Sequence, residues 1–308
     1  MSTALGYRNF GTADVQEFFE RPDPSPGSAE VLIRVAAAGV NPLDHLLRSG
    51  QVPDLNGHVP FPQVIGMEAA GTVLAVGDDV TGLAVGDRVT GFALTGAGTY
   101  AGTTLLLGES TARIPDTLPW TWAATIPVAG TTALDVLDQL ALPAGASLLV
   151  NGIGGGVGIA LAQLAQERDL VVVGTGSTAK RDLATRTGAT FVDYTAGDVV
   201  ERLRAHAPDG FDAVVDNVGG ESLRDIAPLA AKPDMLVSVG DMSVTELGGV
   251  TVHRRLDRAS LERVAELMAT RRLDPHITQT YPLARAQEAL AVVESRVAAG
   301  KLVIDMSL

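Results

Sequence analysis

The chain of 308 residues contains no cysteine. Disulfide bonds, a cysteine nucleophile and any zinc site built on thiolates are therefore excluded. Aromatic residues make up only 4% of the sequence and charged residues 19%, whereas apolar residues reach 46%, which is typical of a globular α/β core packed with small aliphatic side chains. The length favours two domains over one.

Basic residues are also scarce. The formal net charge is −13 at pH 7, so the mean surface potential repels nucleic acids and anionic membranes. The N-terminus lacks the basic start and apolar segment of a secretory signal, which predicts a cytoplasmic protein. The uncharged stretch 139–166 is interrupted by Pro143 and by the glycines of 152–158, so we predict a buried strand, loop and helix there rather than a membrane span.

The sequence offers no evident metal site. A zinc dehydrogenase needs three protein ligands and an open position, and histidines that share a helical site recur at i and i+4. The five histidines fall in separate segments without that pairing: His45, His58, His206, His253 and His276. We therefore expect no bound metal, and we interpret these histidines, apart from His45, as structural or surface residues.

Two patterns divide the chain. Residues 30–108 form short β-rich runs broken by Gly, Pro and Asp, which predicts a compact β-barrel-like domain. From about residue 143 strands and helices alternate, which predicts a parallel, doubly wound sheet. The helices expected in this region are 157–167, 179–187, 197–206 and 221–230. Amphipathic helices at 258–272 and 284–298 precede a last strand, KLVIDMSL, which we expect to return to the first domain.

A glycine-rich turn follows the first strand of the alternating region. The segment LLVNGIGGGVGIALAQLA predicts a buried strand, a tight turn and a helix whose N-terminus can face a pyrophosphate. The G-x-G-x-x-G pattern is incomplete, because Ile153 takes the place of its first glycine. The glycines of the loop are Gly152, Gly154, Gly155, Gly156 and Gly158. A turn without a ligand is the alternative, but the flanking strand and helix favour a dinucleotide site.

The second strand of the alternating region ends without an acidic residue. An NAD site usually places a carboxylate there to accept hydrogen bonds from the ribose hydroxyls. The segment LVVVGTGSTAKRDL instead offers Ser177, Lys180 and Arg181, and Asp182 falls on the following helix. Cationic groups suit a 2′-phosphate, so the sequence favours NADPH over NADH. The alternative is that Lys180 and Arg181 are ordinary solvated side chains.

The segment GMEAAGTVLAVGDDV, followed by VGDRV, is similar to the G-H-E-x2-G-x5-G-x2-V signature of the medium-chain dehydrogenase/reductase superfamily. Met67 stands where the zinc-dependent members have histidine. Further matches are AAAGVNPLD, PVAGTTA, the glycine loop, DYT, DNVGG and VSVG. With these motifs the chain resembles the zinc-free quinone oxidoreductase branch nearly from end to end.

The resemblance implies an α/β fold of two domains. A GroES-like, β-barrel-type catalytic domain would comprise 1–122, completed by 273–308, and a Rossmann domain that binds NADP would comprise 123–272. It also implies a homodimer that transfers hydride from NADPH to a quinone or an α,β-unsaturated carbonyl without a metal. An enoyl-thioester reductase of the same fold and a non-catalytic NADPH-binding protein are the alternatives.

The resemblance also assigns cofactor-binding roles by position. Asn41 would face the nicotinamide and the substrate, and the loop residues Gly155, Gly156 and Val157 would cradle the pyrophosphate. The other implied positions are Thr131 at the nicotinamide ribose or phosphates, Ser177, Lys180 and Tyr194 at the 2′-phosphate, Asn217 at the ribose, Ser238 and Gly240 near the carboxamide, and Arg296 before the last strand.

The chain departs from the family where a proton donor is expected. Many quinone reductases have a tyrosine two residues after the Asp of their N-x-x-D motif, and this chain has Leu46 there. Asp44 and His45 are adjacent to it, and either could relay a proton, with a structural role as the alternative. Tyr100 could donate a hydrogen bond to a substrate oxygen, unless it is simply a buried tyrosine. The short turn at 96–99 predicts an open substrate pocket.

Overall fold

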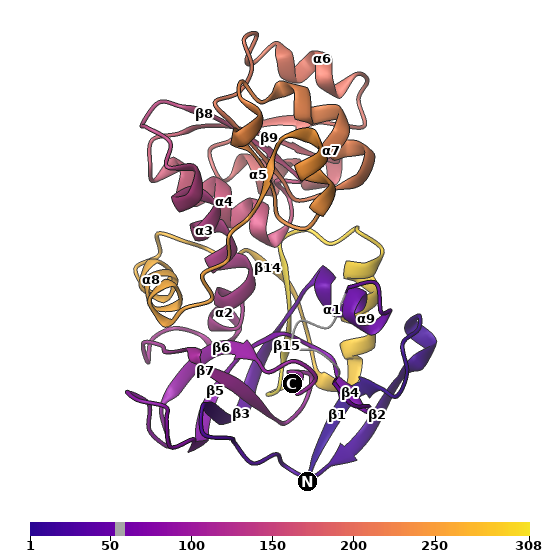
Figure 1. The fold of residues 1–308 in the computed structure, drawn as a ribbon, viewed down its shortest axis with the longest axis vertical. Coiled ribbons are helices and arrows are strands. Elements are labelled where there is room, and N and C mark those ends of the chain that lie inside the picture. The colour runs from indigo at the N-terminus through magenta and orange to yellow at the C-terminus, as the bar shows by residue number, and fades with distance from the viewer. Residues whose placement is uncertain (53–58) are drawn as a thin grey trace. The chain divides into compact units, whose positions relative to one another are not determined.

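The computed structural model describes residues 1–52 and 59–308 (Figure 1). The chain divides into two compact units. Unit 1 comprises residues 1–128, 256–271 and 277–308, and unit 2 comprises residues 129–255 and 272–276. Throughout the described residues, no helix has both the length and the apolar character needed to cross a membrane.

Unit 1 consists mainly of β-strands. Its strands are β1 Ser2–Tyr7, β2 Gln16–Arg21, β3 Glu30–Val40, β4 Gln63–Val64, β5 Glu68–Val76, β6 Arg88–Ala93, β7 Thr103–Arg113, β14 Ile277–Tyr281 and β15 Lys301–Asp305. Its helices are α1 Pro42–Arg48, α2 Trp120–Ala123, α8 Arg258–Ala269 and α9 Ala286–Glu294, with 3-10 turns η1 Ala13–Val15 and η7 Leu283–Arg285. The π-helical turn η2 Ile126–Gly130 contains the division between the units.

The larger sheet of unit 1 has the strand order β14-β15-β3-β5-β6-β7, and β3 also pairs with β7, which closes the barrel. Alternation along β3 explains its position, because Val31, Ile33 and Val35 are buried while Arg34 between them is exposed. The last strand β15 pairs antiparallel with β3, with Leu302 opposite Val40. The expected return of the C-terminal strand to the first domain is thus confirmed.

Unit 2 alternates strands and helices. Its strands are β8 Ser147–Asn151, β9 Val171–Gly176, β10 Thr190–Asp193, β11 Ala213–Asp216, β12 Leu236–Ser238 and β13 Val250–Thr251. Its helices are α3 Thr131–Leu140, α4 Gly156–Gln166, α5 Arg181–Thr185, α6 Val199–Arg204 and α7 Gly220–Ile226. Its 3-10 turns are η3 Thr178–Lys180, η4 Ala227–Leu229, η5 Pro233–Met235 and η6 Met242–Leu247.

The six strands of unit 2 form one parallel sheet in the order β10-β9-β8-β11-β12-β13. Leu148, Leu149 and Val150 of β8 are all fully buried, as expected for a strand covered on both faces. The sheet grows from β8 first toward β10 and then toward β13, so its order reverses beside β8. Open α/β sheets bind ligands beyond the carboxyl ends of the strands at such a reversal. The predicted Rossmann sheet is confirmed.

The two units differ from the expected domain ranges at α8, near α2 and at residues 273–276, which belong to unit 2. Residues 256–271 belong to unit 1, because the Arg258 guanidinium donates to the carbonyls of Thr111 at 2.9 Å and Gly108 at 3.1 Å in β7. The first division falls after Val128 rather than after residue 122. Helix α2 stays with unit 1, where the Thr90 hydroxyl donates to the Ala123 carbonyl at 2.7 Å.

Candidate functional site

The glycine loop joins β8 to α4 where the order of the sheet reverses. Gly152 has φ of +80°, a left-handed conformation that glycine adopts without strain. A Cβ at Gly158 would lie 2.5 Å from the carbonyl oxygen of Gly152, so only glycine lets the helix pack against the loop. Backbone conformation therefore explains the glycine at position 152, and close backbone packing explains the glycine at position 158.

At Gly155, neither the backbone conformation nor a close contact with the described residues requires glycine. It is the N-cap of α4 with φ of −91° and ψ of 170°, and a Cβ there would have the Gly152 carbonyl, 3.7 Å away, as its nearest neighbour. Gly240 is similar, with nothing within 4 Å of a built Cβ. Gly156 and Val157 continue from Gly155 as the first residues of α4. A glycine with free space beside a helix N-terminus fits the close approach of a pyrophosphate.

Lys180 lies against this loop. A Cβ at Gly154 would come within 2.6 Å of Cβ and Cδ of Lys180, so the lysine stem packs on the glycine backbone. Partial burial lowers the pKa of Lys180, and its ammonium forms no ion pair within the described parts of the chain. A half-buried cation without a counter-charge stabilises a bound anion.

The other residues predicted at the 2′-phosphate gather near Lys180. Ser177 caps η3 at the end of β9, and the N–H of Tyr194 donates to the Gly176 carbonyl at 3.1 Å, which brings the ends of β9 and β10 together. The Tyr194 side chain is 55% exposed. The structure therefore brings together the residues that the sequence predicted for this end of the cofactor.

Arg181 has structural partners of its own. Its guanidinium stacks on the Phe191 ring, 4.8 Å from the centroid, and lies 3.9 Å from the Asp193 carboxylate. Hydrogen bonds from Thr178 and Thr195 hold the pKa of Asp193 at about 2. Asp193, at the end of β10, is therefore an acidic residue near the predicted phosphate site. Its carboxylate oxygens already accept hydrogen bonds from Thr178 and Thr195.

Asn217 and Ser238 lie at the carboxyl ends of the strands of unit 2. The Ser238 hydroxyl donates to Asp216 at 2.9 Å and accepts from the Asp241 N–H at 3.1 Å, so it stabilises the strand end. Nδ2 of Asn217 donates to the Asn151 carbonyl at 3.0 Å, whereas its Oδ1 is buried without a hydrogen-bond partner among the described residues. A ribose hydroxyl would satisfy this acceptor.

Thr131, the first residue of α3, is buried within a polar network of unit 2. Its hydroxyl accepts a 2.8 Å hydrogen bond from Arg254, and the same guanidinium lies 3.1 Å from the buried Asp135 carboxylate. The contact of Thr131 with the cofactor stays a prediction.

Asn41 belongs to a buried polar cluster in unit 1. Nζ of Lys301 lies 2.8 Å from Oε1 of Glu68 and 2.8 Å from Oδ1 of Asn41, and Nδ2 of Asn41 donates to Oε1 of Glu68 at 2.8 Å. The second Glu68 oxygen accepts the Val128 N–H at 2.7 Å. Both ends of the Asn41 amide thus have partners within unit 1, and its role beside the nicotinamide stays a prediction. Sequence reasoning missed Lys301, which is the first residue of β15.

Asp44 is held by two donors. It is 2% exposed on α1, and its Oδ2 accepts the Asn41 N–H at 2.8 Å and the Tyr100 hydroxyl at 2.9 Å. Its Oδ1 is buried without a hydrogen-bond partner in the described structure. Burial raises the pKa of Asp44 to about 7, although both hydrogen bonds act to lower it. Tyr100 is fully buried, and burial raises its pKa well above the usual value, so it orients Asp44 as a buried tyrosine.

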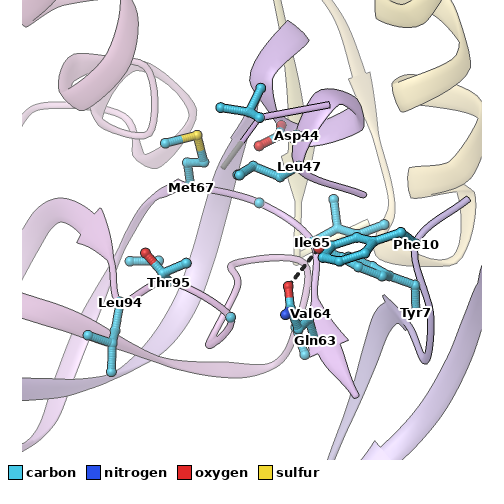
Figure 2. A pocket seen from close by; sticks show the side chains of 14 residues that line it. Tyr7, Phe10, Asp44, Leu47, Gln63, Val64, Ile65, Met67, Leu94 and Thr95 are labelled. Atoms are coloured by element: carbon cyan, nitrogen blue, oxygen red, sulfur yellow. Dashed lines mark hydrogen bonds between the residues drawn. The ribbon is translucent and has the colours of Figure 1, made fainter. Parts of the chain in front are cut away.

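Asp44 also lines a cavity of about 50 Å³ in unit 1 (Figure 2). Such a volume holds one or two waters or the carbonyl end of a larger molecule. Figure 2 shows the Asp44 carboxyl beside Leu47, with Met67 nearby and the rings of Tyr7 and Phe10 at another side. Asp44 is the only acidic or basic residue among the described residues that line this cavity.

The other candidate residues do not line this cavity. His45 is partly exposed, burial lowers its pKa, and it is not among the described residues that line the cavity. Arg296 is exposed with φ of +61° just after α9. Residues 1–52 and 59–308 contain no group of three or more His, Asp or Glu that could hold a metal, and His58 lies outside these described residues.

Two family models match the chain. The alcohol dehydrogenase GroES-like domain matches residues 27–116, and the zinc-binding dehydrogenase family matches residues 187–304.

Several individual proteins are similar to it. A synaptic vesicle membrane protein VAT-1 homolog from Danio rerio is 31% identical over 239 residues, which is 76% of this chain and 48% of that protein. The chain spans about half the length of these curated relatives. The structure of a mycobacterial quinone oxidoreductase is 30% identical with a TM-score of 0.82, covering 99% of this chain and 100% of its own. The structure of Escherichia coli quinone oxidoreductase complexed with NADPH is 25% identical with a TM-score of 0.87, covering 98% and 99%.

Proposed function

Because the chain belongs to the medium-chain dehydrogenase/reductase superfamily, in its zinc-free quinone oxidoreductase branch, we propose that it is an NADPH-dependent oxidoreductase. Its acceptor is a quinone or an α,β-unsaturated carbonyl, and the reaction uses no metal ion. Unit 2 binds the nucleotide, and unit 1 binds the acceptor.

The chemistry divides between cofactor and chain. NADPH, when bound, supplies the hydride. Quinones and enones stabilise the negative charge they receive, as a hydroquinone anion or an enolate, so no Lewis acid is needed. The chain then has to hold the acceptor in place, exclude water and deliver one proton to the reduced product.

The main support for NADPH over NADH is the packing of Lys180 on Gly154. The ammonium is half-buried beside a loop whose Gly155 leaves space at a helix N-terminus, and it has no carboxylate partner in the described residues. A 2′-phosphate would provide the missing negative charge, whereas the ribose hydroxyl of NADH would leave the cation unpaired. Exposed Tyr194 and Ser177 provide further hydrogen-bond donors at the same place.

The cavity favours a neutral acceptor over a phosphate-bearing acyl-thioester. Its described lining contains no basic side chain, and its one charged group is the carboxyl of Asp44. A cavity of about 50 Å³ admits only the reacting end of an acceptor, and any phosphate close to that end would lack a counter-charge in the described lining. Tyr7 and Phe10 instead provide aromatic faces (Figure 2), which suit a planar acceptor ring.

The test of cofactor choice compares Lys180→Ala with the wild type in NADPH and NADH titrations at fixed, moderate salt. A hydrogen bond to a charged group is worth about 1.5 to 3 kcal/mol, so NADPH affinity should fall about 10- to 150-fold while NADH affinity stays nearly constant. Lys232→Ala is the matched control, because Lys232 is an exposed lysine in the same unit. Equal weakening of both cofactors, or a wild-type preference for NADH, refutes the assignment.

The acceptor is tested with a panel that contains a quinone, an enone and an acyl-thioester, each with NADPH. Turnover of the quinone or the enone supports the proposal. Preference for the acyl-thioester would instead identify an enoyl-thioester reductase, and NADPH binding without turnover of any acceptor would identify a non-catalytic binding protein.

A further inference from the structure

We propose that Asp44 is the proton donor of this enzyme and that it delivers the proton from Oδ1 to the oxygen of the reduced acceptor. The inference rests on the proposed function, because the oxygen anion forms only after hydride transfer. It assigns the step for which the chain lacks the tyrosine that many quinone reductases carry, since Leu46 occupies that position.

The hydrogen bonds around Asp44 distinguish its two oxygens. Oδ2 already accepts from the Asn41 N–H and the Tyr100 hydroxyl, which leaves no room there for a third proton. Oδ1 is buried and has no hydrogen-bond partner among the described residues. A proton on the carboxyl must therefore reside on Oδ1. Because Asp44 lines the cavity and Oδ1 is its unpartnered oxygen, we infer that Oδ1 donates to a molecule bound there.

The surroundings of Asp44 keep this proton available near neutral pH. Burial is the main cause of the raised pKa, and the neighbouring carboxylate of Glu68 on β5 adds to it. The ammonium of Lys301 on β15 and the Tyr100 hydroxyl act in the opposite direction. These are the charged and titratable groups that face Asp44, and with them its pKa is about 7. An acid whose pKa lies near the working pH is the most effective proton donor.

The proposed step balances. With a quinone, hydride reduces the acceptor by two electrons to a hydroquinone monoanion, and the cofactor is oxidised to NADP⁺. The O–H bond of Asp44 then breaks, and an O–H bond forms on the anionic oxygen, which gives the neutral hydroquinone. The carboxylate left behind takes its next proton from water.

The other candidate donors fit this step less well. Tyr100 is fully buried, and its proton is already donated to Asp44. His45 is partly exposed and absent from the described cavity lining. Tyr7, which does line the cavity, donates its hydroxyl to Gln63 at 2.7 Å. Tyr100 is accordingly a positioning residue, because it acts through Asp44.

The first experiment compares Asp44→Asn with the wild type. The amide can still accept both hydrogen bonds that Oδ2 accepts, but it has no acidic proton to transfer. We expect kcat for menadione to fall about 100-fold or more near neutral pH, with NADPH affinity unchanged. Asp87→Asn is the matched control, because Asp87 accepts the N–H of Ala84 three residues earlier at 2.7 Å, as Asp44 does for Asn41, yet it does not line the cavity.

Two further measurements separate proton donation from a structural role. Dichloronaphthoquinone gives a more acidic hydroquinone than menadione, so its reduction depends less on the donor and should slow less in Asp44→Asn. In the cofactor-free protein, infrared spectroscopy should show the C=O band of a protonated carboxylic acid that titrates near pH 7 and disappears in Asp44→Asn.

Tyr100→Phe tests whether the pKa of Asp44 controls the pH dependence of the reaction. Removing the hydroxyl removes a hydrogen bond that lowers the pKa of Asp44, so the pKa rises. Because the acid works in its protonated form, the fall of kcat/KM at high pH should shift upward by about one pH unit.

The outcomes keep the two proposals distinct. Failure of the wild type to bind NADPH or to reduce any quinone or enone refutes the proposed function. A wild type that reduces menadione, together with an Asp44→Asn variant that keeps full kcat or slows both quinones equally, refutes the role of Asp44 alone.

Discussion

The hydroxyl of Tyr100 donates a 2.9 Å hydrogen bond to Oδ2 of Asp44, although 56 positions separate the two residues in the sequence. The backbone holds the tyrosine in place, because the Leu5 N–H donates to its carbonyl and its own N–H donates to the Ile65 carbonyl, each at 2.9 Å. Asp44 is the third residue of α1, and its side chain accepts the N–H of Asn41, the N-cap of this helix. The orientation of one buried carboxyl is therefore fixed from two parts of unit 1.

The raised pKa of Asp44 predicts how the stability of the protein depends on pH. An unfolded aspartate has a pKa of about 3.9, whereas burial raises the pKa of Asp44 to about 7 in the folded state. The folded protein therefore holds an extra proton between these values, and the contribution of Asp44 to the free energy of unfolding is lost as pH rises from about 4 to about 7.

Asp44→Asn removes this titration. We compare the free energy of unfolding of the variant with that of the wild type. The difference, variant minus wild type, should increase by up to about 4 kcal/mol between about pH 4 and about pH 7.5. Urea denaturation of both proteins at the two pH values measures the change. A constant difference between them would mean that Asp44 has an ordinary pKa in the folded protein.

The glycine loop offers a matched pair of substitutions. Gly155→Ala places a methyl group in open space, 3.7 Å from the nearest atom, so folding should be unaffected. If that space belongs to the pyrophosphate, NADPH affinity should fall about tenfold or more. Gly158→Ala forces a methyl group to within 2.5 Å of the Gly152 carbonyl, so it should reduce stability by about 1 to 3 kcal/mol.

Thermal unfolding and NADPH titration of both variants separate the two effects. Unchanged NADPH affinity in a stable Gly155→Ala protein would show that the loop is only a turn.

Local signals made the alternating region predictable. An apolar run, a group of glycines and a second apolar segment indicate a strand, a turn and a helix in that order, and the structure confirms them as β8, the glycine loop and α4. Helix lengths were less predictable. The helix expected at 179–187 is a 3-10 turn followed by α5, which ends at Thr185, and Gly188 beyond it has φ of +82°. The helix expected at 284–298 ends at Glu294, two residues before Arg296 turns to φ of +61°.

The polar contacts of the candidate site could not be predicted in the same way. Lys301 and Glu68 are 233 positions apart, and only the pairing of β15 with β3 and of β3 with β5 brings their side chains together. A lysine that begins a terminal apolar strand carries no sequence signal of a buried ion pair. The family signature pointed to Glu68 but not to its partner, just as the N-x-x-D motif pointed to Asp44 but not to Tyr100.

Chelation tests the proposed independence from metal. The sequence has no cysteine, and Met67 stands at the position of the histidine of zinc-dependent relatives. Exhaustive dialysis against EDTA should therefore leave quinone or enone reduction within about twofold of the untreated rate, because the sequence has no cysteine thiolate and residues 1–52 and 59–308 contain no group of three or more His, Asp or Glu that could hold catalytic zinc. Activity that disappears and returns only with added zinc would contradict this prediction.

The pair Lys301 and Glu68 predicts a non-additive effect on stability. Both side chains are almost fully buried, with Nζ and Oε1 2.8 Å apart. Lys301→Met leaves the Glu68 carboxylate buried without its counter-charge, which should lower the free energy of unfolding by about 3 to 5 kcal/mol. Adding Glu68→Gln removes the unpaired buried charge while keeping an acceptor for the Val128 N–H, so the double variant should be more stable than Lys301→Met alone.

Urea denaturation of the two single variants and the double variant measures the coupling between Lys301 and Glu68, with exposed Lys232→Met as the control for losing a lysine. If the effects of the two single substitutions simply add, Glu68 and Lys301 do not stabilise each other. The ion pair would then not be what stabilises the polar cluster around Asn41.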